Sequence, residues 1–397
     1  MALFHSPKTS TDGLVFMYDT GNRKSYVGEP TTNTAGTTNL ATYWNNSGTA
    51  SWSTDDTNVP RLFPDVPVLS MEKLTDGNSH IGVGYTSATV STEYTYSVYV
   101  WIPSTNSSSM AGSVPYFRPQ PANIFSGSLS YNGSTSWGTW PRNQWIRISI
   151  TATTPSTNVT TAYISCYMNT TGDKIYFTCP QIEQKGHITP FVNGTRSSTQ
   201  GLIDRTGNET IDLSNVSFDS NAQMNFDGTD DFIALVDNPQ NGEHSVSWEF
   251  ITKFDLVHDN ETSTYRQLYI QESSVWIGQY YDYIGIDIAK DNGSWFDGNG
   301  GRNTNSKIGP VNSGQYYHVV FTWDGINVKG YLNGELGFTT AISGLTGIRN
   351  GVTPRRIGRR SGNPLIGEMP VVKLYNQALT STEVTKNFNA IRSRFGL

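Results

Sequence analysis

Residues 316–335 most restrict the fold, because they contain two strand-like segments and, near the end of the second, the turn dipeptide Asn333-Gly334. Residues 316–325 and 328–335 are rich in aromatic and β-branched side chains, which favour pleated strands. A two-residue hairpin loop of type I′ needs positive φ at both central positions, and Asn-Gly adopts it readily. The stretch therefore predicts an antiparallel hairpin, and with it a sheet, near the end of the chain.

The composition of the whole chain fits the same kind of structure. Hydrophobic residues make up 36% and charged residues 15% of the 397, and both shares are low. Aromatic residues, at 12%, supply enough apolar surface for packed cores. Segments such as 93–102, 144–151 and 174–183 have strand character and are bounded by turn residues. We expect an all-β chain with two β-sandwich (jelly-roll) domains and a short C-terminal helix.

Domain boundaries follow from shifts in composition. Residues 1–30 are expected to form an N-terminal strand or arm, a candidate attachment segment. Residues 31–195 form the first sandwich and residues 196–215, rich in Gly, Ser, Thr and Asn, a linker. The second sandwich covers 216–380, and the helix covers 381–397.

The helix is predicted by its start and by its apolar stripe. Thr380 and Glu383 have the spacing of a capping box, in which each side chain accepts a backbone N–H bond of the first turn. The stripe, which we expect to pack on a sandwich face, consists of Val384, Phe388, Ile391 and Phe395.

The order and spacing of the C-terminal motifs resemble the laminin-G-like, concanavalin-type jelly-roll family over about residues 218–385. The residues that carry the resemblance are Phe226-Asp227-Gly228, Trp323-Asp324-Gly325, Tyr331-Leu332-Asn333-Gly334, Arg356-Ile357-Gly358, Gly367-Glu368 and Leu374-Tyr375-Asn376. The resemblance implies a sandwich that often binds sugars or proteins. It does not assign an enzymatic activity, since a fold does not fix a function.

Asp227, Asp230 and Asp231 place three carboxylates in one loop of this region. Calcium prefers such hard oxygen ligands, and the resemblance implies one structural calcium, as in many laminin-G-like domains. The alternative is an ordinary β-turn, in which Asp side chains accept bonds from the local backbone. The three residues are therefore a candidate calcium site.

Two other stretches resemble structural proteins of tailed-bacteriophage particles. Residues 13–26 match an opening pattern of such proteins, in which we interpret Asp19 as a turn residue. Residues 180–191 are similar to the end of carbohydrate-binding-module jelly rolls in those particles. The resemblance implies a virion surface protein, assembled in the host cytoplasm, with other virion proteins of the capsid or tail and host surface glycans as partners. We expect a homo-oligomer in that setting.

Catalytic motifs are missing from the sequence. Retaining glycosidases use two carboxylates about 5 Å apart, and Glu249 and Asp255 lie too far apart along a strand that rises about 3.3 Å per residue. We interpret Glu368 as a turn or edge group and His318 as a core or hydrogen-bonded residue. The chain is therefore expected not to be an enzyme, and a polysaccharide hydrolase is the weakest alternative.

Sugar binding would use exposed aromatic side chains next to polar ones. The candidates in the second sandwich are Tyr281, Asp282, Tyr283, Trp295, Asp297 and Asn299, and those in the first are Trp137 and Trp140. Most aromatic side chains of a sandwich belong to its core, which is the alternative for each of them.

Charge, hydropathy and cysteine usage exclude other classes. The formal net charge of −6 argues against general nucleic-acid binding, and no stretch of about 18 apolar residues predicts membrane insertion. Cys166 and Cys179 are too few for a disulfide framework; buried free thiols are expected, with one bridge as the alternative.

The sequence thus favours a non-enzymatic virion surface protein of a tailed phage, of the capsid-decoration or head-fibre type. A long repetitive shaft is missing, which disfavours a complete tail fibre. The alternative is a tail-fibre or receptor-binding adhesin that grips host glycans.

Overall fold

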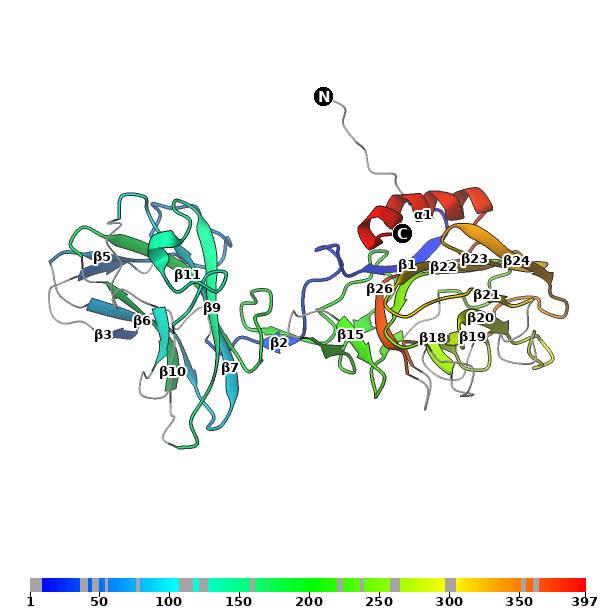
Figure 1. Ribbon diagram of the computed structural model, residues 1–397, viewed down its shortest axis with the longest axis horizontal. Helices are drawn as coiled ribbons and strands as arrows, with labels where there is room; N and C mark the ends of the chain where they lie inside the picture. The colour runs from blue at the N-terminus through cyan, green and yellow to red at the C-terminus, as the bar shows by residue number, and fades with distance from the viewer. Residues whose placement is uncertain are drawn as a thin grey trace, which may run out of the picture. The chain divides into compact units, whose positions relative to one another are not determined.

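The computed structural model describes residues 9–35, 42–44, 50–53, 56–75, 79–106, 117–120, 128–157, 161–168, 170–219, 224–235, 239–257, 265–296, 305–350, 355–359 and 364–397. These residues divide into two compact units, each built from antiparallel sheets (Figure 1). The predicted fold class, an all-β chain with two sandwiches and a C-terminal helix, is confirmed.

The N-terminal sandwich consists of the described part of Thr31–Arg196. Its sheets have the strand orders β3-β6-β10-β8 and β4-β5-β11-β7-β9, and β2 pairs with β12. The elements are β2 (Thr31–Thr32), β3 (Thr42–Trp44), β4 (Ala50–Ser53), β5 (Leu69–Lys73), β6 (Ser79–Ser87), β7 (Glu93–Trp101), β8 (Phe117–Gln120), the 3-10 helix η1 (Trp137–Thr139), β9 (Trp145–Thr153), β10 (Thr161–Met168), β11 (Lys174–Glu183) and β12 (Thr195–Arg196). Alternate side chains of both sheets, such as Val98, Ile164 and Phe177, point inward and form the core.

Residues 180–191 close this sandwich with buried hydrogen bonds. The Glu183 carboxylate, 0% exposed, accepts bonds from the hydroxyl groups of Thr31 (2.8 Å) and Thr189 (2.7 Å). It also accepts bonds from the Gln181 amide (2.8 Å) and the Thr189 backbone N–H (3.0 Å). A buried carboxylate is tolerated when it is hydrogen-bonded in this way, so the Gln181, Glu183 and Thr189 positions of this motif have a structural role.

The C-terminal sandwich consists of the described parts of Met1–Pro30, Ser197–Asp219 and Gln223–Leu397. One sheet has the order β14-β15-β26-β17-β22-β23-β24, with β1 also on β26, and the other has the order β13-β16-β25-β18-β19-β20-β21. The elements are β1 (Leu14–Asp19), β13 (Ile211–Asp212), β14 (Ser217–Phe218), β15 (Met224–Asp227), β16 (Ile233–Leu235), β17 (Val246–Phe254), β18 (Tyr265–Gln271), β19 (Val275–Tyr280), β20 (Tyr283–Ile288), β21 (Lys307–Ile308), β22 (Tyr316–Trp323), β23 (Asn327–Leu332), β24 (Glu335–Ala341), β25 (Arg355–Ile357), β26 (Ile366–Tyr375) and α1 (Ser381–Phe395).

The predicted hairpin is present. Asn333 and Gly334, with φ of 51° and 82°, join β23 to β24, and Leu332 pairs with Glu335 across the turn. Both central residues have the positive φ that a type I′ turn requires. The hairpin forms the end of the eight-stranded sheet at β24.

The N-terminal segment and the expected linker differ from the sequence-based boundaries. β1 is not a separate arm, because it pairs with residues 371–375 of β26 inside the C-terminal sandwich. Within residues 196–215, Leu202, Ile211 and Leu213 are at most 1% exposed and belong to the core of the same sandwich. Burying these apolar side chains outweighs the flexible composition around them.

The helix α1 lies along the outer face of the eight-stranded sheet (Figure 1), defined here as the face that carries Ile251, His318 and Lys373. The predicted capping box is present, with Thr380 as the N-cap and Glu383 three residues later. Gly396 ends the helix in the left-handed conformation, a common C-terminal cap. The helix thereby brings Arg394 and Phe395 to a defined place over the sheet.

Under α1 lies a buried polar network centred on Glu249, which is 1% exposed. Its carboxylate accepts hydrogen bonds from Lys373 (2.7 Å), Tyr375 (2.9 Å) and Asn387 of α1 (2.7 Å). The His318 ring lies 3.2 Å from the same carboxylate, in agreement with its interpretation as a buried hydrogen-bonded residue. Burial alone would raise the pKa of Glu249, but the charges and hydrogen bonds of Lys373 and His318 hold it below its usual range.

Cys179 is a free, buried thiol on β11 whose pKa burial raises to about 11. Cys166 lies on β10, in the other sheet of the N-terminal sandwich, and its side chain is outside the described residues. No helix in the part of the chain that the structure describes is both long and apolar enough to cross a membrane.

Candidate functional site

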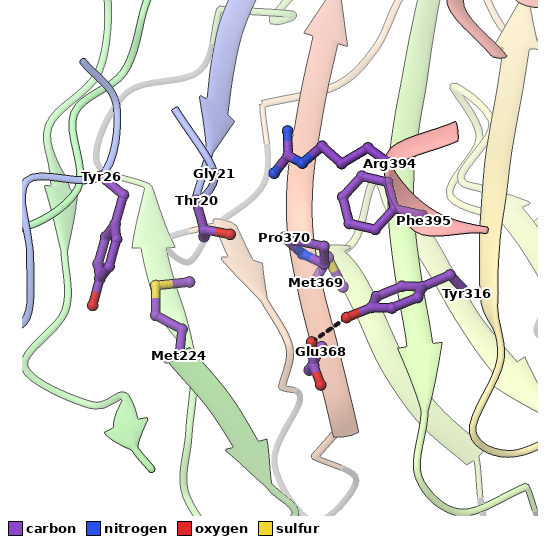
Figure 2. A pocket seen from close by; sticks show the side chains of 10 residues that line it. All are labelled: Thr20, Gly21, Tyr26, Met224, Tyr316, Glu368, Met369, Pro370, Arg394 and Phe395. Carbon is purple, nitrogen blue, oxygen red and sulfur yellow. Dashed lines mark hydrogen bonds between the residues drawn. The ribbon is translucent and has the colours of Figure 1, made fainter. Parts of the chain in front are cut away.

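A pocket of about 240 Å³ lies on the C-terminal sandwich, where β1 ends and β15 begins along the same edge of β26 (Figure 2). It is lined by Thr20, Gly21, Tyr26, Met224, Tyr316, Glu368, Met369, Pro370, Arg394 and Phe395. In Figure 2, Tyr26 stands on one side, Tyr316 and Phe395 on the other, and the segment around Met369 and Pro370 lies between them.

Three polar side chains form a row across the sheet at this pocket. In the strand register Lys253 of β17 is opposite Tyr316 of β22 on one side and Glu368 of β26 on the other. The Tyr316 hydroxyl donates to the Glu368 carboxylate, and the Lys253 ammonium forms an ion pair with that carboxylate. Directly opposed side chains of neighbouring strands are close enough for such contacts. A bulge between Ile251 and Lys253 adjusts the β17–β26 register just before this row.

The charges of the row reinforce each other. Burial alone would lower the pKa of Lys253, but Glu368 and Asp255 outweigh it and raise that pKa. Burial, followed by the negative charge of Glu368, raises the pKa of the Tyr316 hydroxyl above its usual value. The row therefore favours the charged form of the Lys253 amine and the protonated form of the Tyr316 phenol.

The opposite end of the pocket is closed by the N-terminal turn and the last turn of α1. Arg394 Nη1 and Nη2 lie 2.8 and 2.7 Å from the two carboxylate oxygens of Asp19, a bidentate ion pair. Asp19 also accepts the Gly21 N–H at 2.9 Å, so its interpretation as a turn residue agrees with the structure. A Cβ at Gly21 would lie 2.1 Å from Arg394 Nη2, and glycine therefore leaves room for the guanidinium.

The walls and base of the pocket are largely apolar. The rings of Tyr316 and Phe395 lie 4.9 Å apart and form one aromatic wall, and Tyr26 forms the other (Figure 2). Met224 and Met369, both buried, line the pocket between these rings. Aromatic faces with a few fixed polar groups suit ligands that have an apolar side and several hydroxyl groups.

Glu368 is the single carboxylate among the described residues that line the pocket. A glycosidase needs two carboxylates flanking the bond that it cleaves. The groups that line the pocket can hold a ligand through hydrogen bonds and ring contacts.

The predicted group around Tyr281 is brought together at a different place. Tyr281 and Asp282 form the turn between β19 and β20, and the rings of Tyr281 and Tyr283 are 6.3 Å apart. Lys307 Nζ lies 3.8 Å from the centre of the Tyr283 ring. The two tyrosines are half-buried and Asp282 is exposed, so these three residues remain a predicted second sugar site.

Trp295 does not join that group. It bridges to Ala289, just beyond the far end of β20, which separates it from Tyr283 by the length of the strand, about 20 Å at roughly 3.3 Å per residue. Asp297 and Asn299 are outside the described residues.

The two candidate tryptophans of the N-terminal sandwich have different outcomes. Trp140 is 4% exposed, stacks on Phe117 with 6.3 Å between ring centres, and donates its indole N–H to the Ser134 carbonyl oxygen at 3.0 Å. It is a core residue, contrary to the expected exposed platform, because burying a large aromatic ring stabilises the sandwich. Trp137 lies in η1, and its side chain is outside the described residues.

The three aspartates of the candidate calcium loop are close together, with carboxylate oxygens within 4.8 Å of one another. Asp231 is buried and accepts the backbone N–H groups of Ser217 (2.6 Å) and Asp227 (2.7 Å), one on each oxygen. Asp227 accepts the Thr229 N–H at 2.7 Å. Calcium takes six to eight oxygen ligands, and these three carboxylates, one of them bonded to two backbone N–H groups, supply only part of that set.

The pocket residues were missed by the sequence analysis, which interpreted Glu368 as a turn or edge group. Glu368 is not in a turn, because it lies within β26 opposite Lys253 of β17. On its other side the pairing of β26 with β15 ends at Gly367 and that with β1 ends at Val371, so Glu368 does lie at a local edge of the sheet. An available clue was the pattern of residues 13–26, which ends in Tyr26. The sequence did not show which residues lie near Tyr26 in the fold, because Arg394 and Phe395 are more than three hundred positions away in the chain.

Comparison with known proteins agrees with the fold of this sandwich. Residues 226–385 match a laminin-G family described as the concanavalin A-like lectin/glucanases superfamily. No curated protein sequence matches the chain.

Solved structures resemble about half of the chain. The binding domain of Paraclostridial mosquitocidal protein 1 has a TM-score of 0.38 and 17% identity, over 48% of this chain and 49% of that one. The botulinum neurotoxin serotype D ligand-binding domain, solved with N-acetylneuraminic acid, has a TM-score of 0.36 and 14% identity over 49% of each chain. This chain thus spans about half the length of these structures, and likeness at this level says nothing about what it binds. The C-terminal sandwich contains a concanavalin A-like, laminin-G jelly-roll domain.

Proposed function

We propose that this chain is a carbohydrate-binding protein without enzymatic activity and that the pocket beside Tyr316 and Glu368 holds the sugar. The observation that carries the proposal is the combination of aromatic side chains on both sides of the pocket with a fixed carboxylate and a fixed guanidinium. Sugar rings have an apolar C–H face and a rim of hydroxyl groups, which matches such walls and such polar groups. The match to the lectin/glucanases superfamily supports the same class.

We propose that the chain is not an enzyme because of the surroundings of Glu368, the carboxylate that lines the pocket. Catalytic acids need a proton to give, whereas the Glu368 carboxylate is held between the Lys253 ammonium and the Tyr316 hydroxyl. A polysaccharide hydrolase would instead shorten the bound glycan, which the binding experiment below would reveal.

The setting that we propose is the surface of a tailed-phage particle, as a homo-oligomeric capsid-decoration or head-fibre protein. Support comes from the two stretches that resemble phage particle proteins, residues 13–26 and 180–191. A tail-fibre adhesin is the alternative. Antibody-gold labelling of intact particles separates them: label over the head supports decoration, label on the tail supports the adhesin, and bare particles reject the virion setting.

A glycan array tests carbohydrate binding. We expect the intact chain to bind at least one glycan, Phe395→Ala to reduce that binding at least tenfold, and Tyr283→Ala to leave it unchanged. Loss of binding in Tyr283→Ala, with binding kept in Phe395→Ala and thermal stability unchanged, would move the site to the Tyr281–Tyr283 turn. A blank array, or a bound glycan that is progressively cleaved, would overturn the proposed function.

A further inference from the structure

The pocket's charges are balanced in pairs. At one end Glu368 faces Lys253, and at the other Arg394 faces Asp19 through two bonds of 2.7 and 2.8 Å. Figure 2 shows Glu368 and Arg394 at opposite ends of the pocket. Each ionic group that reaches the pocket thus already has a counter-ion of its own.

This balance selects against charged ligands. A ligand carboxylate at Arg394 would meet a guanidinium whose charge Asp19 already balances, and a ligand ammonium at Glu368 would meet a carboxylate whose charge Lys253 already balances. A neutral hydroxyl group meets no such competition, because a guanidinium has five N–H donors and each carboxylate oxygen accepts more than one bond. Separating an existing ion pair in a partly buried site costs free energy. The new contact between the protein and a charged ligand would only recover that cost, so it adds no net binding free energy.

The volume limits the size of the bound group. About 240 Å³ is below the roughly 300–1,000 Å³ of pockets that enclose drug-sized ligands. A space of this size suits one six-membered sugar ring better than a longer stretch of a glycan. Ion-paired side chains line its two ends, Glu368 with Lys253 and Arg394 with Asp19.

We infer that the pocket holds a single uncharged pyranose, presented as the terminal residue of a glycan. This inference rests on the proposed carbohydrate binding and narrows it to one ligand class. Tyr26 and the Tyr316–Phe395 wall would contact the ring faces, while Glu368 and Arg394 would bond hydroxyl groups at its two ends.

Ligand-observed NMR with free monosaccharides tests this inference on the intact chain. The neutral probes are the methyl α-pyranosides of glucose, galactose and mannose; the charged probes are glucuronic acid, glucosamine and N-acetylneuraminic acid. We expect one neutral probe to bind at least tenfold more tightly than every charged probe. Glu368→Gln should weaken that probe at least fivefold, while Arg392→Ala, on the same helix but outside the pocket, should not.

Removing the negative charge of Asp19 provides a second test of the inference. Asp19→Asn keeps the oxygen that accepts the Gly21 N–H but leaves Arg394 without its counter-ion. We expect this variant, at unchanged thermal stability, to gain at least fivefold affinity for glucuronic acid relative to the neutral probe. Tighter binding of a charged probe by the wild-type chain, or no gain in the variant, would overturn the inference.

The two proposals fail separately. A glycan array that is positive while no monosaccharide binds would reject the single-residue pocket and leave carbohydrate binding in place. A blank array together with silent NMR probes would reject both.

Discussion

Asp19 and Arg394, 375 positions apart in the sequence, form a bidentate ion pair at the edge of the pocket. Asp19 is the last residue of β1 and Arg394 lies in the last turn of α1. The pair therefore connects the start and the end of the described chain at the place where the ligand is proposed to bind. Its partners reach that place because β1 pairs with β26 and α1 packs on the same sheet.

Replacing Arg394 by Ala should separate binding from stability. The Arg394 side chain is 38% exposed, and exposed ion pairs contribute about 0–1 kcal/mol, so we expect little change in the free energy of unfolding. Glycan binding should fall at least tenfold. Arg392→Ala is the matched control, since it removes the same kind of exposed side chain from the same helix outside the pocket. Equal binding by both variants would contradict this role for Arg394.

The network under α1 should be far more sensitive. Lys373 and Glu249 are each 1% exposed, and removing one partner of a buried pair leaves an uncompensated charge that costs about 3–5 kcal/mol. We expect Lys373→Met to destabilise the chain by that amount in urea unfolding. The double variant with Glu249→Gln should be more stable than Lys373→Met alone. A single variant that loses less than about 1 kcal/mol would show that the pair is not essential for docking α1.

Acid stability should depend on Asp56 of the N-terminal sandwich. Burial opposes its ionisation, but hydrogen bonds from Ser70 (2.6 Å) and Asn58 and the ion pair with Lys174 (3.2 Å) lower its pKa from 3.8 to about 2. Because the folded-state pKa is depressed, the stabilisation is present above about pH 4 and is lost as the pH falls toward 2.

We expect this carboxylate to contribute about 1–2 kcal/mol at pH 6. Urea unfolding of wild type and Asp56→Asn at pH 6 and pH 2.5 measures it, and acid should destabilise the wild type more than the variant. Other carboxylates titrate in both proteins, so the difference isolates Asp56. The same loss in both proteins would assign acid sensitivity to other groups.

The calcium expectation can be tested through thermal stability. Asp231 is satisfied by two backbone N–H donors, and burial raises its pKa. We therefore expect the midpoint of thermal unfolding to shift by less than about 2 °C between 1 mM calcium and excess EDTA, since a ligand that stabilises must bind the folded state tightly. If calcium raised the midpoint of thermal unfolding by several degrees, and Asp230→Asn abolished that rise, the three aspartates would bind calcium after all.

Local patterns predicted the parts of the fold that local chemistry controls. The Asn333-Gly334 turn and the Thr380–Glu383 cap appear as expected, because each depends on residues adjacent in sequence. The insertion of β1 beside β26 was missed, since an apolar strand does not indicate which edge it will pair with. The pocket row of Lys253, Tyr316 and Glu368 depends on the register of three strands and on a bulge. Long-range register of this kind is not visible in one sequence.

The sequence also did not predict which of the candidate aromatic side chains would be buried. Trp140 has mostly small or polar sequence neighbours and Tyr283 directly precedes Ile284, yet Trp140 is 4% exposed in a core and Tyr283 is half-buried next to Lys307. Which face of a strand or loop meets the core decides the outcome, and composition does not contain that information.

The most direct test of sugar binding is a crystal structure of the chain with a glycan selected on the array. The account predicts one terminal sugar ring between Tyr26 and the Tyr316–Phe395 wall, with hydroxyl groups on Glu368 and Arg394. A sugar located at the Tyr281–Tyr283 turn or on the N-terminal sandwich, with this pocket holding only water, would contradict it.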